Sequence, residues 1–157
     1  MVKADQAGRR KKVILIVDDE LDMRTFLSTL VKLGGYEAVL AKDGEEGMLK
    51  AEKIRPDLLI LDVMMPAEGG VIMYNRLKAD ADLRQIPVIM LSAVAKNAFY
   101  HYLGALNIKL DGSILTPEAY IEKPPEAENL MRVIKTILGE KLRRKSRSII
   151  SRTGKSM

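Results

Sequence analysis

The 157-residue sequence contains no cysteine, which excludes disulfide bonds, thiolate metal sites and a cysteine nucleophile. Long hydrophobic runs are also lacking, since stretches such as residues 13–17 and 58–61 are far shorter than the roughly 20 apolar residues of a membrane-spanning helix. The N-terminus has no apolar signal-peptide core. We therefore expect a cytoplasmic protein without a membrane span, whose chemistry depends on oxygen and nitrogen groups.

Positive charge is concentrated at the two ends of the chain. The net charge is +5, but residues 1–12 carry five basic side chains against one acidic, and residues 140–157 carry seven against one, so the centre is acidic. Basic ends can attract nucleic acid or anionic lipid. Here they contain no aromatic residue and no binding motif, so we interpret them as solvated and expect no nucleic-acid binding. The N-terminal tail covers residues 1–11, and a C-terminal helix extension or tail covers residues 140–157.

Apolar segments alternate with helical patterns over residues 12–139, a length suited to one domain. Near-continuous Val, Ile and Leu predict buried parallel strands at residues 13–17, 36–41, 58–63, 88–91 and 120–121. Apolar residues at helical spacing indicate helices over residues 21–33, over residues 45–54 and from residue 126 onward. This alternation predicts an α/β fold, an open doubly wound five-stranded parallel sheet of flavodoxin-like type.

Polar residues stand where four of these strands end. Asp18 and Asp19 follow the first strand and Asp62 ends the third, while Ser92 and Lys123 end the fourth and fifth. Because ligands bind at the carboxyl ends of parallel strands, we expect these side chains to converge. Converging carboxylates repel one another, and a hard divalent cation such as Mg²⁺ relieves that repulsion with oxygen ligands. Asp62 could then attack phosphorus as a carboxylate nucleophile, with Lys123 neutralising the transferred group.

At this point four motifs, in order and each beside a predicted strand, resemble the response-regulator receiver family over about residues 12–139. Each motif alone is weak, but their order and context are specific together. The motifs are Val17-Asp18-Asp19-Glu20, Leu61-Asp62-Val63-Met64-Met65-Pro66, Leu91-Ser92-Ala93 and Glu122-Lys123-Pro124.

The resemblance implies a phosphoacceptor site that uses Mg²⁺. Asp62 matches the aspartate that accepts the phosphoryl group, and Asp18 and Asp19 match the acidic pair that binds the ion. The Met64 backbone carbonyl matches the third protein ligand of the ion. The resemblance also implies a sensor histidine kinase or a phosphotransfer protein as the source of the group.

Three further positions match residues that contact the phosphoryl group or respond to it. Ser92 matches the switch hydroxyl, Lys123 matches the phosphoryl-binding lysine, and Tyr120 matches the aromatic switch residue. The peptide bond between Lys123 and Pro124 is commonly cis in this family.

Simpler structural roles compete with these assignments. Asp18 or Asp19 alone could cap the first helix, and Tyr120 could serve only as packing. Glu20 and Asp43 are interpreted as local capping and turn residues.

The sequence departs from the family between Ser92 and Lys123, which lie 31 positions apart, a longer separation than is usual there. This predicts an enlarged region between strands 4 and 5. Either a lengthened fourth helix and an ordered loop pack on the domain, or the aromatic run at residues 99–102 forms a patch for a partner or a second copy. His101 lies within this run and receives no catalytic role.

The leading hypothesis is therefore a stand-alone receiver, in which phosphorylation of Asp62 shifts the strand 4, helix 4 and strand 5 face. That shift would change the binding of a downstream partner or of a second copy. Such a chain is a phosphoacceptor and not an ordinary enzyme. A second hypothesis is a docking or dimerisation module in which phosphorylation has little effect. A third hypothesis is a phosphohydrolase of the haloacid dehalogenase kind. Such an enzyme needs a second acid two residues after the nucleophile, and because Met64 stands at that position we rank this hypothesis below the other two.

Overall fold

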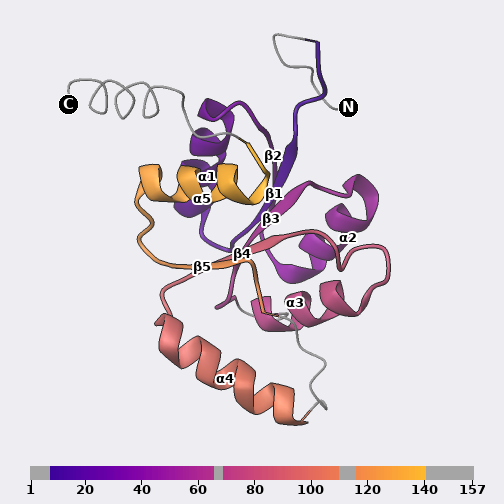
Figure 1. Cartoon of the computed structure of the whole chain (residues 1–157), viewed down its shortest axis with the longest axis vertical. Coiled ribbons are helices and arrows are strands. Elements are labelled where there is room, and N and C mark those ends of the chain that lie inside the picture. The colour runs from indigo at the N-terminus through magenta and orange to yellow at the C-terminus, as the bar shows by residue number, and fades with distance from the viewer. Residues whose placement is uncertain (1–7, 66–68, 110–115, 141–157) are drawn as a thin grey trace, which may run out of the picture.

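Strands and helices alternate along the whole of the described chain. A computed structural model describes residues 8–65, 69–109 and 116–140. Its elements are β1 (Val13–Val17), α1 (Leu21–Leu33), β2 (Glu37–Ala41), α2 (Gly44–Ile54), β3 (Leu58–Asp62), α3 (Gly70–Ala79), β4 (Val88–Ser92), α4 (Lys96–Lys109), β5 (Ala119–Glu122) and α5 (Ala127–Ile137) (Figure 1). All neighbouring strands pair in parallel, in the order β2-β1-β3-β4-β5. The predicted doubly wound, flavodoxin-like sheet is confirmed.

Helices cover both faces of this sheet, with α1 and α5 on one face and α2 and α3 on the other (Figure 1). β1 shows why the strands are apolar throughout. Ile14 and Ile16 pack with the α1 and α5 side chains, whereas Leu15 and Val17 pack with those of α2 and α3. Because successive strand residues point to opposite faces, a strand covered on both sides needs an apolar residue at every position.

Element boundaries agree with the sequence expectation at β1 and α1 and differ by a residue or so elsewhere. The helix α3 had no assigned range, because residues 71–74 form a continuous apolar run without helical spacing. In the structure Met73, Tyr74 and Leu77 of α3 are buried, while Ile72 is 51% exposed. Only part of the run therefore faces the core.

The enlarged region between β4 and β5 contains the fourteen-residue helix α4, which confirms the expected long helix. The loop part of that expectation falls largely on residues 110–115, which lie outside the described residues. Phe99 of α4 is buried and stacks on Tyr120, with ring centroids 4.7 Å apart. Tyr102 is 46% exposed, so the aromatic run is shared between the domain core and the surface. In Figure 1 α4 lies at the lower end of the molecule, beside β5.

The first residue of α3 rests directly on the backbone that carries Asp62. The Gly70 amide donates to the Val63 carbonyl at 3.1 Å. A Cβ atom at position 70 would lie 1.9 Å from the Asp62 carbonyl oxygen and 2.8 Å from the Val63 Cα. Both atoms belong to the backbone and cannot rotate away, so only glycine allows this approach of helix and strand end.

We expect Gly70→Ala to lower the free energy of unfolding by about 1–3 kcal/mol, because α3 or the Asp62 backbone must move. The matched control is Gly69→Ala, whose Cβ would meet the Met65 carbonyl oxygen at an ordinary 3.5 Å. Urea unfolding of both variants checks this. Equal stability of the two variants would show that the close approach at position 70 is unimportant.

Candidate functional site

Parallel pairing brings the polar strand ends to one edge of the sheet. Asp62 pairs with Leu91 across β3 and β4, and Ser92 pairs with Glu122 across β4 and β5. The Lys123 amide then donates to the Ser92 carbonyl at 2.8 Å. The Lys123–Pro124 peptide bond is cis, as the resemblance implied. This register places Asp62, Ser92 and Lys123 side by side although they are far apart in sequence.

Four carboxylates meet at this edge. Asp18, Asp19, Glu20 and Asp62 each offer one oxygen, and these oxygens all lie within 4.8 Å of one another. Asp18 and Asp62 are buried, at 1% and 3% exposure, whereas Asp19 and Glu20 are exposed. The two buried carboxylates come from the ends of β1 and β3, and the two exposed ones follow Asp18 along the chain.

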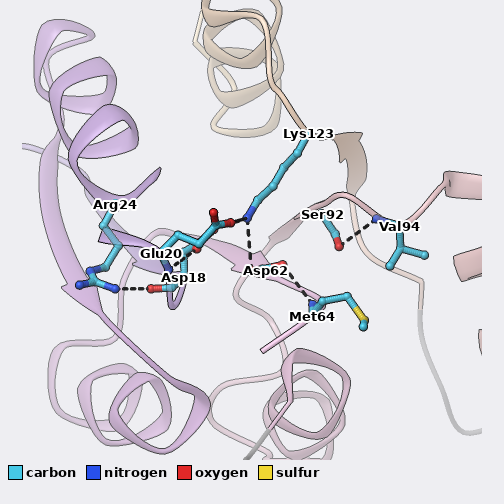
Figure 2. Close-up of polar contacts among 8 residues, drawn as sticks. All are labelled: Asp18, Glu20, Arg24, Asp62, Met64, Ser92, Val94 and Lys123. Carbon is cyan, nitrogen blue, oxygen red and sulfur yellow. Dashed lines mark hydrogen bonds and ion pairs between the residues drawn. The ribbon is translucent and has the colours of Figure 1, made fainter. Parts of the chain in front are cut away.

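The Lys123 ammonium lies among three of these carboxylates (Figure 2). Its Nζ is 2.8 Å from Asp18 Oδ2, 3.0 Å from Glu20 Oε1 and 3.3 Å from Asp62 Oδ2. Burial by itself lowers the pKa of Lys123, but the carboxylates outweigh it and raise the pKa above its usual value. Lys123 is therefore a permanent cation at the centre of the cluster.

One ammonium does not balance all of the negative charge. Burial, followed by the nearby Asp18 carboxylate, raises the pKa of Asp62 to about 6, although Lys123 and a hydrogen bond from Met64 oppose the rise. The Met64 amide donates to Asp62 Oδ1 at 3.0 Å. The raised pKa indicates that the site has capacity for a further positive charge.

The donor set fits Mg²⁺. Asp18 Oδ2 is buried, and its partner among the described residues is the Lys123 ammonium at 2.8 Å. The rest of Asp18 is held in place, because its Oδ1 accepts from the Glu20 amide at 2.9 Å and its carbonyl accepts from Arg24 at 2.7 Å (Figure 2). A fixed carboxylate oxygen beside other carboxylates is the kind of ligand that Mg²⁺ prefers. Asp18, Asp19 and Asp62 are the residues that would hold the ion. The Met64 carbonyl stays a prediction.

The expected capping role is confirmed for Asp43, whereas Glu20 occupies the N-cap position of α1 but does not cap the helix with its side chain. Asp43 caps α2, because its Oδ1 accepts from the Glu46 amide at 2.8 Å. The Glu20 side chain makes no capping hydrogen bond to α1 within the described chain, and its carboxylate pairs with Lys123. The acidic pair directly before it was the available signal, because a third carboxylate in succession reaches the same cation.

Ser92 and Tyr120 both contact the short segment that joins β4 to α4. Ser92 is fully buried, and its Oγ accepts from the Val94 amide at 3.2 Å. The Tyr120 hydroxyl donates to the carbonyl of the same Val94. Burial raises the pKa of Tyr120, and a side-chain hydrogen bond with Ser92 partly offsets this rise. The two candidate switch residues are thus linked to each other and to one backbone unit.

Among the helices of the described residues, none has the length and the apolar character needed to span a bilayer.

Comparison with known proteins gives a family and several relatives. The family model of the response regulator receiver domain matches residues 14–135. The polar-differentiation response regulator DivK of Brucella anthropi is 34% identical over 130 residues, which covers 83% of this chain and 98% of that protein. The probable transcriptional regulator ycf27 of Cyanophora paradoxa is 37% identical over 128 residues, which covers 82% of this chain. The chain spans about half the length of ycf27, at 48%.

Solved structures agree in fold. The chemotaxis protein CheY4 of Vibrio cholerae superimposes with a TM-score of 0.70 at 25% identity, over 81% of this chain and 98% of that one. The signal receiver domain of a histidine kinase from Syntrophus aciditrophicus gives 0.69 at 29% identity, over 82% of this chain and 90% of that one. Together with the match of the family model, these likenesses show that the chain belongs to the response regulator receiver domain family.

Proposed function

We propose that this chain is a cytoplasmic phosphoacceptor switch of two-component signalling. Asp62 accepts a phosphoryl group from a sensor histidine kinase or a phosphotransfer protein in an Mg²⁺-dependent reaction. One observation carries the proposal: a buried carboxylate lies 3.3 Å from a partly buried ammonium and within 4.8 Å of three other carboxylates. Membership of a family of signalling proteins supports it.

The residues around Asp62 suit attack on phosphorus. An Asp62 oxygen forms the new bond to phosphorus, and the bond between phosphorus and the donor nitrogen or oxygen breaks, with the electron pair leaving on the donor. Mg²⁺, when bound, supplies positive charge to the transferred oxygens. The Met64 amide holds Asp62 Oδ1, which orients the carboxylate, and the Lys123 ammonium beside Oδ2 neutralises charge during transfer.

The proposed response passes through Ser92 and Tyr120. A phosphoryl oxygen on Asp62 draws the Ser92 hydroxyl toward itself and away from its present partners. Because Val94 contacts both Ser92 and Tyr120, a change at either end of this linkage displaces the segment before α4. The face formed by β4, α4 and β5 then changes its affinity for a downstream partner.

The alternative is a docking or dimerisation unit whose binding does not depend on phosphorylation. The length of α4 and the exposed Tyr102 favour keeping this candidate. Sedimentation of the chain with and without a phosphodonor separates the two functions. A phosphoacceptor switch should self-associate more strongly through the face of β4, α4 and β5 after phosphorylation. Equal association in both states would favour the docking unit.

A first test is phosphorylation by a small donor. Incubation with Mg²⁺ and acetyl phosphate should add one phosphate-sized increment to the intact mass, because Asp62 is the nucleophile. Asp62→Asn should lose the increment, whereas Asp82→Asn, which alters an exposed aspartate elsewhere, should keep it. Absence of the increment from the parent chain would shift support to the docking unit.

A second test measures how much the buried charges lower the free energy of unfolding. Without metal, Asp62→Asn should unfold with a free energy about 1–2 kcal/mol above that of the parent near neutral pH, since one of two repelling buried carboxylates is gone while Lys123 keeps its other partners. The pKa of folded Asp62 is about 6, against an ordinary 3.8. Between these values the folded parent binds more protons than the unfolded chain, so the parent gains stability as pH falls through this window.

The difference in the free energy of unfolding between Asp62→Asn and the parent should therefore shrink as the pH falls from about 7 to about 4. Urea unfolding in the presence of a chelator measures this difference at each pH. Asp82→Asn, which changes an exposed aspartate outside the cluster, serves again as the control. A constant difference across this range would contradict the raised pKa of Asp62.

A further inference from the structure

A second polar feature lies at the edge of the sheet opposite to Asp62, where β1 begins. A groove of about 540 Å³ is lined there by the four consecutive basic residues 9–12, the Gly34–Gly35 turn, Tyr36 and Glu140. The segment leading into β1 and the C-terminal end of α1 both lie at the upper end of the molecule in Figure 1, away from α4.

Four basic side chains and one carboxylate line this groove, so its lining carries a formal net positive charge. Lys12 donates to the Leu138 carbonyl at 2.9 Å, a neutral acceptor that leaves its charge intact. Arg10 pairs with Asp57 at 3.1 Å. The one carboxylate among the lining residues is already engaged, since Glu140 accepts from the Tyr36 hydroxyl at 2.8 Å and lies 3.6 Å from Lys135. The groove therefore retains a net positive charge.

The end of α1 adds both charge and apolar surface beside the groove. Lys32 is exposed, and Leu33 is 81% exposed directly before the Gly34–Gly35 turn that lines the groove. The residue next to the groove lining is thus an exposed apolar side chain, directly preceded by an exposed basic one. We call residues 9–12 together with Lys32 and Leu33 the basic face.

The sequence supplies more positive charge from the same place. Residues 141–157 follow directly from Glu140, which lines the groove, and contain seven Lys or Arg side chains and no acidic residue. Residue 141 therefore continues the chain from a residue of the groove lining into a strongly basic stretch.

We propose that the basic face binds the anionic lipid surface of a bilayer peripherally. Lipid phosphates match the basic side chains, and each Lys or Arg near an anionic membrane strengthens binding about fivefold. Leu33 decides between anionic partners, because a bilayer accepts an exposed leucine into its headgroup region, whereas a nucleic-acid backbone offers it nothing. Tyr36 is 3% exposed and cannot stack on bases. The proposal does not depend on phosphorylation of Asp62.

Co-sedimentation of the whole chain with vesicles tests the proposal. We expect binding to phosphatidylcholine vesicles that contain phosphatidylglycerol, little binding to pure phosphatidylcholine, and weaker binding as salt rises. The double variant Lys11→Glu with Lys32→Glu should bind at least about 30-fold more weakly, since the loss of two attractive charges alone gives that factor and the acidic replacements add repulsion. The control is Lys42→Glu with Lys96→Glu, which makes the same change in net charge beside the opposite edge and should remain within a few-fold of the parent.

Two further variants separate lipid from other partners. Leu33→Ser should weaken vesicle binding several-fold and leave any affinity for duplex DNA unchanged. Asp62→Asn should bind vesicles like the parent, so loss of phosphorylation and loss of membrane binding are distinguishable. Circular dichroism of each variant confirms that it is folded. Equal binding to neutral and anionic vesicles, no vesicle binding at all, or tighter binding to random duplex DNA at the same salt would each overturn the proposal.

Discussion

The Lys123 ammonium is the cation that the carboxylates at the carboxyl edge of the sheet share, and it stabilises their close approach. Without it, the buried carboxylates of Asp18 and Asp62 would face each other with no cation between them, at a cost of several kcal/mol. Its single charge balances only part of theirs, as the raised pKa of Asp62 indicates. The domain thus folds around an incomplete charge balance, and this imbalance is the physical basis for the metal binding and the chemistry proposed at Asp62.

The parallel register is what gives this contact its geometry. Each strand starts at one end of the sheet and finishes at the other. Residues that follow different strands therefore lie close together in space although they are far apart in the sequence. The same arrangement gathers the segments that precede the strands at the opposite end, where basic residues 9–12 lie beside the end of α5. Two chemically distinct ends therefore follow from one topology.

Much of this could be predicted from the sequence, because the strongest signals are local or tied to strand ends. The apolar run at β1 gave its bounds directly, and the positions of Asp18, Asp62 and Lys123 followed from strand alternation. Other features depend on three-dimensional neighbours. Residues 71–74 carry no helical spacing, so α3 was not located, and the role of Glu20 depends on a lysine 103 positions away. The groove joins residues 9–12 to Glu140, which no local pattern reveals.

The close packing of α3 against the end of β3 affects how the domain can move. Because a Cβ atom at position 70 would overlap the backbone of Asp62 and Val63, the start of α3 lies in direct backbone contact with the end of β3, which leaves little room for a shift on that side. The opposite flank is built differently, since Ser92 and Tyr120 are joined to the segment before α4 by individual hydrogen bonds that can be exchanged. The two flanks of Asp62 thus differ in how they are held, and we expect the proposed rearrangement to run toward β4 and α4 and not toward α3.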